Sequence, residues 1–484
     1  MTAFTIVWIA LPFLVGFSIY LLPRLDRPLA LGVTLVSLVY GGMLFGQPIG
    51  LDIALLDSFG VTLLADNLSA WFILTNALVT AAVVIYCWPT AKSAFFYTQA
   101  IILHGSINAT FICADFISLY VALEVIGIAA FLLIAYPRSP KTLWVALRYL
   151  FISNTAMLFY LIGAILVYQT HQSFAYTGLR GAPIEAVALI VGGLLTKGGV
   201  FISGLWLPLT HSEAESPVSA LLSGVVVKAG VFPLVRFALM MEEWLPLMAL
   251  LGVAAALLGV IYALTETDAK RVLACSTLSQ LGWILAVPPA AGFFALAHGL
   301  AKATLFLTVG NLPSRDLPQL RQQPIPTSLW VPLTLASLSI SGFPGLVGFG
   351  AKLATIKAAL PWQPLLLNLA ATGTAILYAQ FIFLPHQRDD KEGWLTTKPG
   401  LWWAVGLLIG AMVLANGAYL GAYTLPNLIK VLAIIGVGWL IQRLLLVRVS
   451  LSLPRGLEAF EHLIGGMSLA LIVLFWMVGS WLAI

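Results

Sequence analysis

The chain has 484 residues, of which 61% are hydrophobic and only 9% are charged, and its mean hydropathy is +1.01. A soluble domain is about one quarter charged, so this composition excludes a soluble globule and indicates a protein folded in a bilayer. The net charge of +5 therefore reflects how the loops are distributed and does not indicate a nucleic-acid partner. The three cysteines, Cys87, Cys113 and Cys275, form no CxxC pair, which argues against an iron–sulfur cluster, a zinc site or a disulfide framework.

Apolar stretches recur along the whole sequence with short polar breaks between them. A spanning helix needs about 20 apolar residues. The first stretch, residues 4–22, is long for a signal peptide and lacks a basic leader, so it predicts a first span. The sequence predicts an all-α, polytopic transmembrane bundle of about 14–16 spans. The candidate spans are residues 4–22, 29–46, 68–88, 95–113, 114–136, 143–168, 184–208, 216–240, 245–265, 270–288, 292–312, 327–358, 363–385, 400–423, 426–446 and 461–483.

Charged residues in the loops predict the orientation of the chain. Alternate loops, starting after the first span, carry Arg24, Arg27, Lys92, Arg138, Lys141, Lys270, Arg271, Arg315, Arg321, Arg388, Lys391, Lys398, Arg443, Arg448 and Arg455. The opposite loops carry Asp52, Asp57, Asp66, Glu242 and Glu243, with Arg180 as almost their only base. The positive-inside rule places the basic loops in the cytoplasm, so both termini are expected outside. Loop 209–216 is an exception, because it carries Glu213 and Glu215 on the cytoplasmic side; we attribute this to its position after a broken helix.

Several ionisable side chains fall within the predicted spans. Each costs at least about 2.5 kcal/mol at the bilayer centre, and such residues usually line a bundle interior or a wet cavity and have a function. Glu124, Lys197 and Lys228 lie too deep to reach the interface, which favours function. Arg236 and Lys357 lie near helix ends, which favours the alternative that they extend to the interface.

A histidine and two more lysines complete the set. His298 and Lys302 are four residues apart and therefore share a helix face, although His298 also fits a packed histidine bonded to a backbone carbonyl. Lys352 lies beside glycines in a later span, and the isolated His104 favours a structural role. Burial lowers the pKa of a lysine and a nearby carboxylate raises it, while histidine titrates near neutral pH unaided. Glutamate, lysine and histidine spread over several helices are expected in a proton relay.

Two of the lysine-bearing spans contain helix-breaking sequence. The first runs from Lys197-Gly198-Gly199 to Trp206-Leu207-Pro208, and the second, residues 341–352, reads SGFPGLVGFGAK. Glycine and proline weaken the helical ladder, and interrupted helices at matching places in two halves point to the ion site of a transporter. The alternative, that glycines only allow close helix packing, leaves the lysine beside each break unexplained.

These residues carry a family resemblance. Residues 206–228, WLPLTHSEAESPVSALLSGVVVK, resemble the antiporter-like subunits, which include Mrp-type sodium/proton antiporter subunits and the proton-pumping membrane subunits of respiratory complex I. Lys197 stands nine residues before Trp206, as is typical of the family. The stretches Ala122–Glu124, His298–Leu307 and Ser341–Lys352 resemble further family motifs, in the expected order over residues 65–385.

The resemblance implies two inverted five-helix repeats, each with a broken helix. The implied parts are amino-terminal helices (1–94), a first repeat (95–240), a second repeat (241–385) and carboxyl-terminal helices (386–484). It also implies a proton relay in which Glu124 pairs with Lys197, Lys228 and His298 or Lys302 lie on a central axis, and Lys352 is the exit site. The sequence departs from the family between Lys197 and the WLP motif, where glycines replace the usual prolines and histidine.

The length of the chain and the lysine at position 352 favour a proton-translocating subunit of an Mrp-type Na⁺/proton antiporter. The alternatives are a proton-pumping subunit of a complex I-like NAD(P)H:quinone oxidoreductase or membrane-bound hydrogenase and, more remotely, a membrane partner in inorganic-carbon uptake. The resemblance implies partner membrane subunits, a bacterial plasma or thylakoid membrane, and transport of H⁺ with or without Na⁺. No dinucleotide, flavin or cluster motif is present, so we expect no cofactor or metal and no catalysis by this chain alone.

Overall fold

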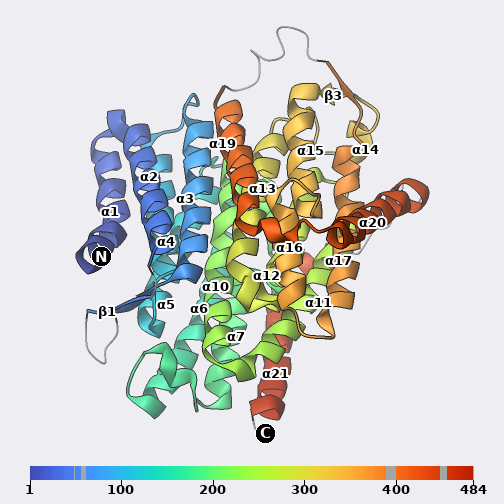
Figure 1. Ribbon diagram of the computed structural model, residues 1–484. Coiled ribbons are helices and arrows are strands. Elements are labelled where there is room, and N and C mark those ends of the chain that lie inside the picture. The colour runs from blue at the N-terminus through green and yellow to red at the C-terminus, as the bar shows by residue number, and fades with distance from the viewer. Residues whose placement is uncertain (48–49, 56–60, 389–398, 447–454, 483–484) are drawn as a thin grey trace.

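The computed structural model is a bundle of long helices with two small two-stranded sheets (Figure 1). It describes residues 1–47, 50–55, 61–388, 399–446 and 455–482. The loop residues Asp57, Lys391, Lys398 and Arg448, and the last residue of span 461–483, lie outside the described residues. Within those residues, 13 helices are long and apolar enough to cross a membrane. The predicted all-α, polytopic bundle is confirmed, and the chain is a multi-pass membrane protein.

The elements follow the predicted spans closely. The first helices are α1 (Thr2–Leu21), α2 (Asp26–Leu44), α3 (Asn67–Cys87), α4 (Ala94–Thr110), α5 (Phe116–Ile134) and α6 (Pro140–His171). The middle of the chain forms α7 (Ile184–Gly198), α8 (Leu207–Glu213), α9 (Ser216–Leu221), α10 (Val227–Met240), α11 (Leu245–Leu264), α12 (Ala269–Ala286) and α13 (Ala291–Val309). The remaining helices are α14 (Leu317–Leu320), α15 (Thr327–Ser341), α16 (Val347–Ala358), α17 (Gln363–Ile382), α19 (Pro399–Asn416), α20 (Leu425–Ile441) and α21 (Phe460–Leu482).

Shorter elements join these helices. Strands β1 (Leu51–Ala54) and β2 (Thr62–Ala65) pair antiparallel, and β3 (Ile325–Pro326) pairs parallel with β4 (His386–Gln387). Short 3-10 turns are η1 (Pro23–Leu25), η2 (Tyr176–Leu179), η3 (Phe201–Gly204), η5 (Glu242–Trp244), η6 (Pro288–Ala290), η7 (Gly417–Ala422) and η9 (Arg455–Glu458). Two π-helical turns, η4 (Leu222–Val226) and η8 (Gln442–Leu446), interrupt or extend helices.

The number of long apolar helices is below the predicted 14–16 for local reasons. Helix α4 has only 17 residues. Helix α12 carries two basic residues in its first turn and several hydroxyl side chains, which lower its hydropathy. The predicted span 327–358 divides into α15 and α16 at the expected break, and α15 appears only among the shorter apolar helices.

Two groups of five consecutive helical segments form the centre of the bundle. The first group is α4, α5, α6, the interrupted pair α7–α8, and α9–α10; the second is α11, α12, α13, the interrupted pair α15–α16, and α17. The break falls in the fourth segment of each group. This order fits the predicted repeats, whose boundaries and inverted relation remain predictions.

The acidic linker that contradicted the positive-inside pattern is neutralised by basic loops. Glu213 pairs with Lys141 at 2.8 Å and lies 3.9 Å from Arg315, and Glu215 pairs with Lys92 at 2.5 Å. Four loops therefore meet at one end of the bundle, and the carboxylates join basic residues there. These ion pairs explain the acidic linker on the side of the basic loops more directly than its position after a broken helix does.

The carboxyl-terminal helices connect distant parts of the bundle. Helix α20 packs on α17 and lies across the direction of the other helices (Figure 1), an arrangement that the sequence did not predict. Helix α21 packs against α7, where a Cβ on Gly192 would approach Leu471 to 2.5 Å. Before α21, the carboxylate of Glu458 accepts from Arg271 at 2.5 Å and its carbonyl accepts from Arg148. Buried ion pairs and close packing thus fix α21 to α6, α7 and α12.

Candidate proton-relay site

The first predicted helix break lies directly after Lys197. Helix α7 ends at Gly198, and Gly199 (φ +66°) and Phe201 (φ +57°) turn the chain with left-handed backbone conformations. Glycine adopts such a conformation without a steric penalty. At the break, the carbonyl of Thr196 accepts a hydrogen bond of 3.1 Å from the backbone N–H of Gly199 and one of 2.9 Å from the indole N–H of Trp206. The WLP motif therefore supplies a donor that stabilises the open helix at membrane depth.

Close packing is a second role of these glycines. A Cβ on Gly230 of α10 would lie 2.2 Å from the backbone nitrogen of Gly198. A Cβ on Gly204 would lie 2.3 Å from the carbonyl oxygen of Gly199. The glycines therefore both break the helix and allow close packing, because the broken end of α7 contacts α10 two residues from Lys228.

Lys197 and Glu124 approach each other without forming a direct ion pair in the described structure. Lys197 is buried, and its Nζ donates to Oγ of Ser153 on α6 at 2.5 Å. The same Nζ would lie 3.1 Å from a Cβ on Gly127, one turn after Glu124 on α5. Glu124 is half-buried and interacts electrostatically with Lys197. The two charges are neighbours that share a small polar site with Ser153, and their functional pairing remains a prediction.

Lys228 is completely buried at the start of α10, next to a turn that packs on α13. It follows the π-helical turn η4 directly, and its Nζ donates to the carbonyl of Gly224 inside that turn. A π-helical turn leaves backbone carbonyls without their ordinary partners and is frequent at functional sites. The Nζ would lie 3.4 Å from a Cβ on Gly299, next to His298. Lys228 thus points from the first group of helices toward the second.

Lys302 is held by two acceptors from neighbouring helices. Its Nζ donates to the carbonyl of Leu273 at 2.7 Å and to the hydroxyl of Tyr378 at 2.9 Å. The Tyr378 hydroxyl also lies 2.8 Å from Oγ of Ser276. Helices α12, α13 and α17 therefore share one buried hydrogen-bonded cluster around this lysine.

His298 and Lys352 line the same small cavity. The cavity has a volume of about 10 Å³ and is also lined by Gln280, which is close to the space that one water molecule needs. Neither ring nitrogen of His298 has a hydrogen-bond partner among the described residues. The packed-histidine interpretation, which requires a backbone carbonyl as partner, therefore fails for the described part of the chain. A water molecule in the cavity would be positioned between His298 and Lys352.

The second break places Lys352 next to freed backbone. Gly342 (φ +89°) and Gly345 (φ +94°) separate α15 from α16, and Nζ of Lys352 lies 3.4 Å from the carbonyl of Ser341. The same Nζ lies 5.3 Å from the centre of the Trp283 ring, which attracts a cation through its π-face. Each break therefore carries one buried lysine, as the sequence predicted.

Burial and mutual repulsion act together on the buried amines of the axis. Among the described residues, no carboxylate lies within 4.0 Å of the amines of Lys228, Lys302 or Lys352. Burial disfavours a charged amine, and a neighbouring charged amine disfavours it further. A proton arriving at one lysine therefore makes the next less able to hold one. Such a row of amines can pass a proton charge along itself, which is the chemistry that a relay requires.

Arg236 and Lys357 behave differently from each other. Arg236 is buried and donates to both oxygens of Asp66, with one N–H···O distance of 2.9 Å. Our expectation that it extends to the interface is wrong, because a carboxylate reaches it at the end of the bundle. Burial alone would raise the pKa of Asp66, but Arg236 and Ser69 together hold that pKa below its ordinary value. Lys357 is exposed, as expected for a lysine at the interface.

His104 belongs to a separate hydrogen-bonded network. Its ring nitrogens lie 2.9 Å from Oγ of Ser37 and 3.3 Å from Oγ1 of Thr80, and Ser37 also accepts from the indole of Trp8 at 3.1 Å. The network joins α1, α2, α3 and α4 and agrees with a structural role. In the part of the chain that the structure describes, no group of three or more His, Cys, Asp or Glu side chains is arranged to hold a metal ion.

Sequence reasoning missed several polar groups near the lysines. Ser153, Tyr378 and Gln280 lie on neighbouring helices with no motif around them, so nothing in the sequence singled them out. His211 had a signal, because it lies inside the quoted WLP stretch. It is fully buried, and its ring lies 6.2 Å from that of Phe306, one turn beyond Lys302.

The family match and the most similar curated sequences point to the same kind of protein. Residues 113–377, more than half of the chain, match the family described as NADH:quinone oxidoreductase/Mrp antiporter, transmembrane. The chain is 28% identical over 316 residues to the NAD(P)H-quinone oxidoreductase chain 4 1 of Synechococcus elongatus, covering 59% of both proteins. It is 27% identical over 418 residues to chain 4-2 of Synechocystis sp., covering 76% of this chain and 75% of the relative.

Solved structures share the fold. A chain of the membrane-bound sulfane sulfur reductase, an archaeal respiratory membrane complex, superposes with a TM-score of 0.75 at 19% identity, covering 89% of this chain and 99% of that one. A chain of the Mrp complex from Dietzia sp. DQ12-45-1b gives a TM-score of 0.73 at 20% identity, covering 96% of this chain and 100% of that one. With its buried lysines, its two broken helices and its matching residues 113–377, the chain belongs to the membrane-subunit family of NADH:quinone oxidoreductases and Mrp antiporters.

Proposed function

We propose that this chain is a proton-translocating membrane subunit of a complex I-like NAD(P)H:quinone oxidoreductase. The observation that carries the proposal is the pair of broken helices, each with a buried lysine beside freed backbone, joined by further buried amines between them. The relatives named above are chain 4 subunits of NAD(P)H-quinone oxidoreductases. They favour this assembly over the Mrp-type antiporter that the sequence alone suggested.

Protons would move by sequential occupation of the buried amines. Lys197 exchanges charge with Glu124 and is held ready by Ser153. Lys228 on the opposite side of the α7 break faces α13, where His298 and Lys302 lie one turn apart. His298 then shares a water-sized cavity with Lys352. When a charge moves at one end of this row of amines, the proton affinity of the next group changes. A conformational or redox event in a partner subunit at one end of the row can therefore drive proton transfer at the other end.

Other membrane subunits are required by this proposal. The chain carries no electron carrier motif, so the driving reaction has to occur in partner subunits. Its helices also expose many large apolar side chains, which suit lipid and neighbouring helices. We place the complex in a bacterial plasma or thylakoid membrane, the membranes of the cyanobacterial relatives.

The decisive experiment compares two lysines of α16. Lys352→Leu removes the buried amine, whereas Lys357→Leu changes an exposed lysine five residues later and is the matched control. In vesicles containing the whole complex, we expect Lys352→Leu to abolish proton transport and Lys357→Leu to retain it. Lys352→Glu is expected to keep part of the activity, since a carboxylate also carries a proton. Normal transport in both Lys352 variants would place the site elsewhere.

An Mrp-type cation/proton antiporter is the second candidate. The observation in its favour is the fold shared with the Mrp complex from Dietzia sp. over 96% of this chain. Purification through a tag on this chain distinguishes the two assemblies, because an oxidoreductase brings iron–sulfur proteins and an antiporter brings only membrane subunits. Proton transport that depends on Na⁺ and persists without a quinone or an electron donor would support the antiporter.

A further inference from the structure

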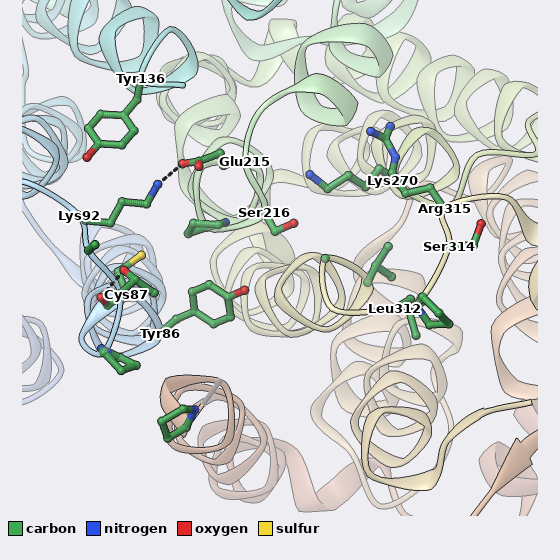
Figure 2. Close-up of a pocket in the computed structure, with 18 residues that line it drawn as sticks. Tyr86, Cys87, Lys92, Tyr136, Glu215, Ser216, Lys270, Leu312, Ser314 and Arg315 are labelled. Carbon is green, nitrogen blue, oxygen red and sulfur yellow. Dashed lines mark hydrogen bonds and ion pairs between the residues drawn. The ribbon is translucent and has the colours of Figure 1, made fainter. Parts of the chain in front are cut away.

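A large cavity opens at the end of the bundle that holds the basic loops. Its volume is about 860 Å³, and Lys92, Glu215, Lys270 and Arg315 are among its lining residues (Figure 2). Lys92 pairs with Glu215 at 2.5 Å on one side of the cavity, and Arg315 pairs with Asp268 at 2.8 Å on the other. Among the described residues, no carboxylate lies within ion-pair distance of Lys270.

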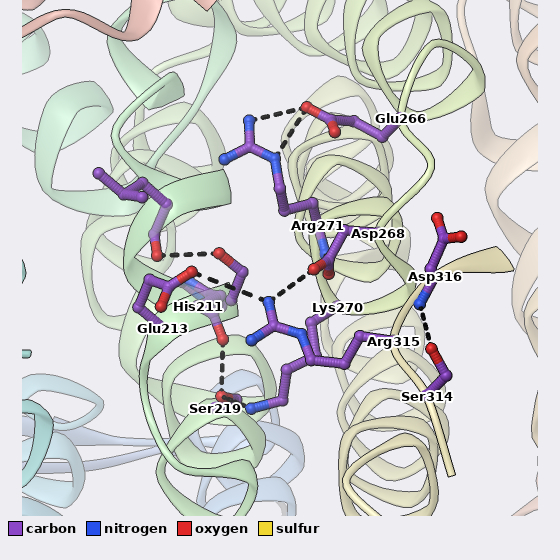
Figure 3. Close-up of polar contacts among 12 residues, drawn as sticks. His211, Glu213, Ser219, Glu266, Asp268, Lys270, Arg271, Ser314, Arg315 and Asp316 are labelled. Atoms are coloured by element: carbon purple, nitrogen blue, oxygen red, sulfur yellow. Dashed lines mark hydrogen bonds and ion pairs between the residues drawn. The ribbon is translucent and has the colours of Figure 1, made fainter. Parts of the chain in front are cut away.

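Lys270 connects the cavity with the interior of the bundle. Its side chain is buried, and its Nζ donates to the carbonyl of Ala214 at 2.7 Å and lies 3.4 Å from Oγ of Ser219. Oγ of Ser219 donates to the carbonyl of His211 at 2.7 Å (Figure 3). These hydrogen bonds therefore lead from the cavity wall to the backbone carbonyl of a buried histidine.

The protonation of His211 follows from its partner. Its Nδ1 lies 3.1 Å from the carbonyl oxygen of Leu207, and a carbonyl only accepts, so Nδ1 carries the hydrogen. In the neutral ring, Nε2 then has a free lone pair. Nε2 has no hydrogen-bond partner in the described part of the chain, although the backbone of Leu222 lies nearby. The side chain is fully buried, so this lone pair is isolated from bulk water.

His211 also lies within electrostatic range of Lys302 and Lys270. Burial, followed by the positive charges of these two lysines, lowers the pKa of His211 to about 3, so its Nε2 holds a proton only transiently. The ring contact with Phe306, one turn beyond Lys302, places the histidine against the same helix α13. The proposed relay of buried amines does not use His211 or Lys270.

We propose that Lys270 and His211 form the entrance of the relay from the cavity at the basic end of the bundle. The inference rests on the proposed proton-translocating function. The ammonium of Lys270 gives a proton, through intervening water, to Nε2 of His211 and becomes a neutral amine. The imidazolium keeps its Nδ1–H on Leu207 and releases the proton from Nε2 to the neutral amine of Lys302. Each step breaks one N–H bond and forms another, and the same steps run in reverse.

Three conservative variants test this entrance in inside-out vesicles that contain the whole complex. His211→Asn keeps a side-chain N–H near Leu207 but lacks Nε2. Lys270→Arg keeps the positive charge but cannot give up its proton. Lys92→Arg, at the opposite wall of the same cavity, is the matched control. We expect proton transport to fall at least tenfold in the first two variants and to stay near the wild-type rate in the control, with unchanged unfolding temperatures.

A chemical rescue supplies an independent result. In inside-out vesicles the cavity faces the external buffer, so ethylamine can reach the space left by Lys270→Ala. Recovery of transport by ethylamine, with none in Lys352→Leu, would support the entrance. Wild-type transport in His211→Asn or Lys270→Arg, or no recovery in a correctly folded Lys270→Ala, would overturn it. If Lys352→Leu also transports normally, the proposed function itself fails; if only Lys352→Leu is inactive, the entrance alone is refuted.

Discussion

The contact between Gly198 and Gly230 provides the sharpest test of how the helix break serves the relay. Replacing Gly230 by alanine would place a Cβ 2.2 Å from the backbone nitrogen of Gly198, whereas ordinary contacts begin at 3.4 Å. Backbone cannot rotate away as a side chain can, so α7 and α10 have to separate by about 1.2 Å, the difference between these two distances. Overpacking of this kind costs about 1–3 kcal/mol, and a displacement of about 1 Å can slow a reaction about a hundredfold.

The measurement combines proton transport with thermal unfolding of the purified complex. Gly406→Ala on α19 is the control, because a Cβ there meets nothing within 4 Å; alanine should stabilise that helix by up to about 1 kcal/mol. We expect Gly230→Ala to lower transport by one to two orders of magnitude and the unfolding temperature modestly. Wild-type transport in a folded Gly230→Ala protein would show that the spacing of Lys197 and Lys228 is unimportant.

Two further predictions concern single hydrogen-bonded contacts. Asp66→Asn keeps the helix cap on Ser69 but leaves Arg236 without a counter-charge, so it should cost about 3 kcal/mol of stability at neutral pH. The pKa of Asp66 is lower in the folded protein than in the unfolded chain, so the Asp66–Arg236 pair stabilises the fold fully above the unfolded pKa of about 3.9 and loses this effect as the pH falls through the folded pKa. The stabilities of variant and wild type should therefore converge in acid. A difference in stability that does not change with pH would contradict the ion pair. Tyr378→Phe removes one acceptor of Lys302, a bond worth about 1.5–3 kcal/mol to a charged amine, and should slow proton transport about tenfold or more, whereas unchanged rates would exclude that hydroxyl from the relay.

The sequence predicted the fold well because each spanning helix carries its own hydrophobic signal. The breaks were also predictable, since glycine and proline act locally through the backbone. The course of α20 was not, because its composition suits a span and only tertiary packing against α17 directs it across the bundle. The pairing of Glu213 with Lys141 likewise joins loops that are distant in sequence.

Only the charged residues of the candidate site could be predicted from the sequence, because a charge inside an apolar span is unusual. Lys197, Lys228 and Lys302 stand out in apolar spans, and the structure places all three in the interior. Their partners do not stand out, since Ser153 and Tyr378 are ordinary residues of membrane helices. Glu124 and Lys197 show what the sequence could not predict. The two charges are neighbours, but the amine of Lys197 donates its hydrogen bond to a serine on a third helix.

The attachment of α21 to α7 has a consequence for biogenesis. Helix α7 is synthesised and inserted long before α21, yet Leu471 of α21 fills the space at Gly192 beside it. The Glu458 contacts with Arg148 and Arg271 also form only after residue 458 has left the ribosome. The first half therefore waits in the membrane with one helix face uncovered by its own chain. Until α21 has been inserted, lipid or other helices have to cover that face of α7.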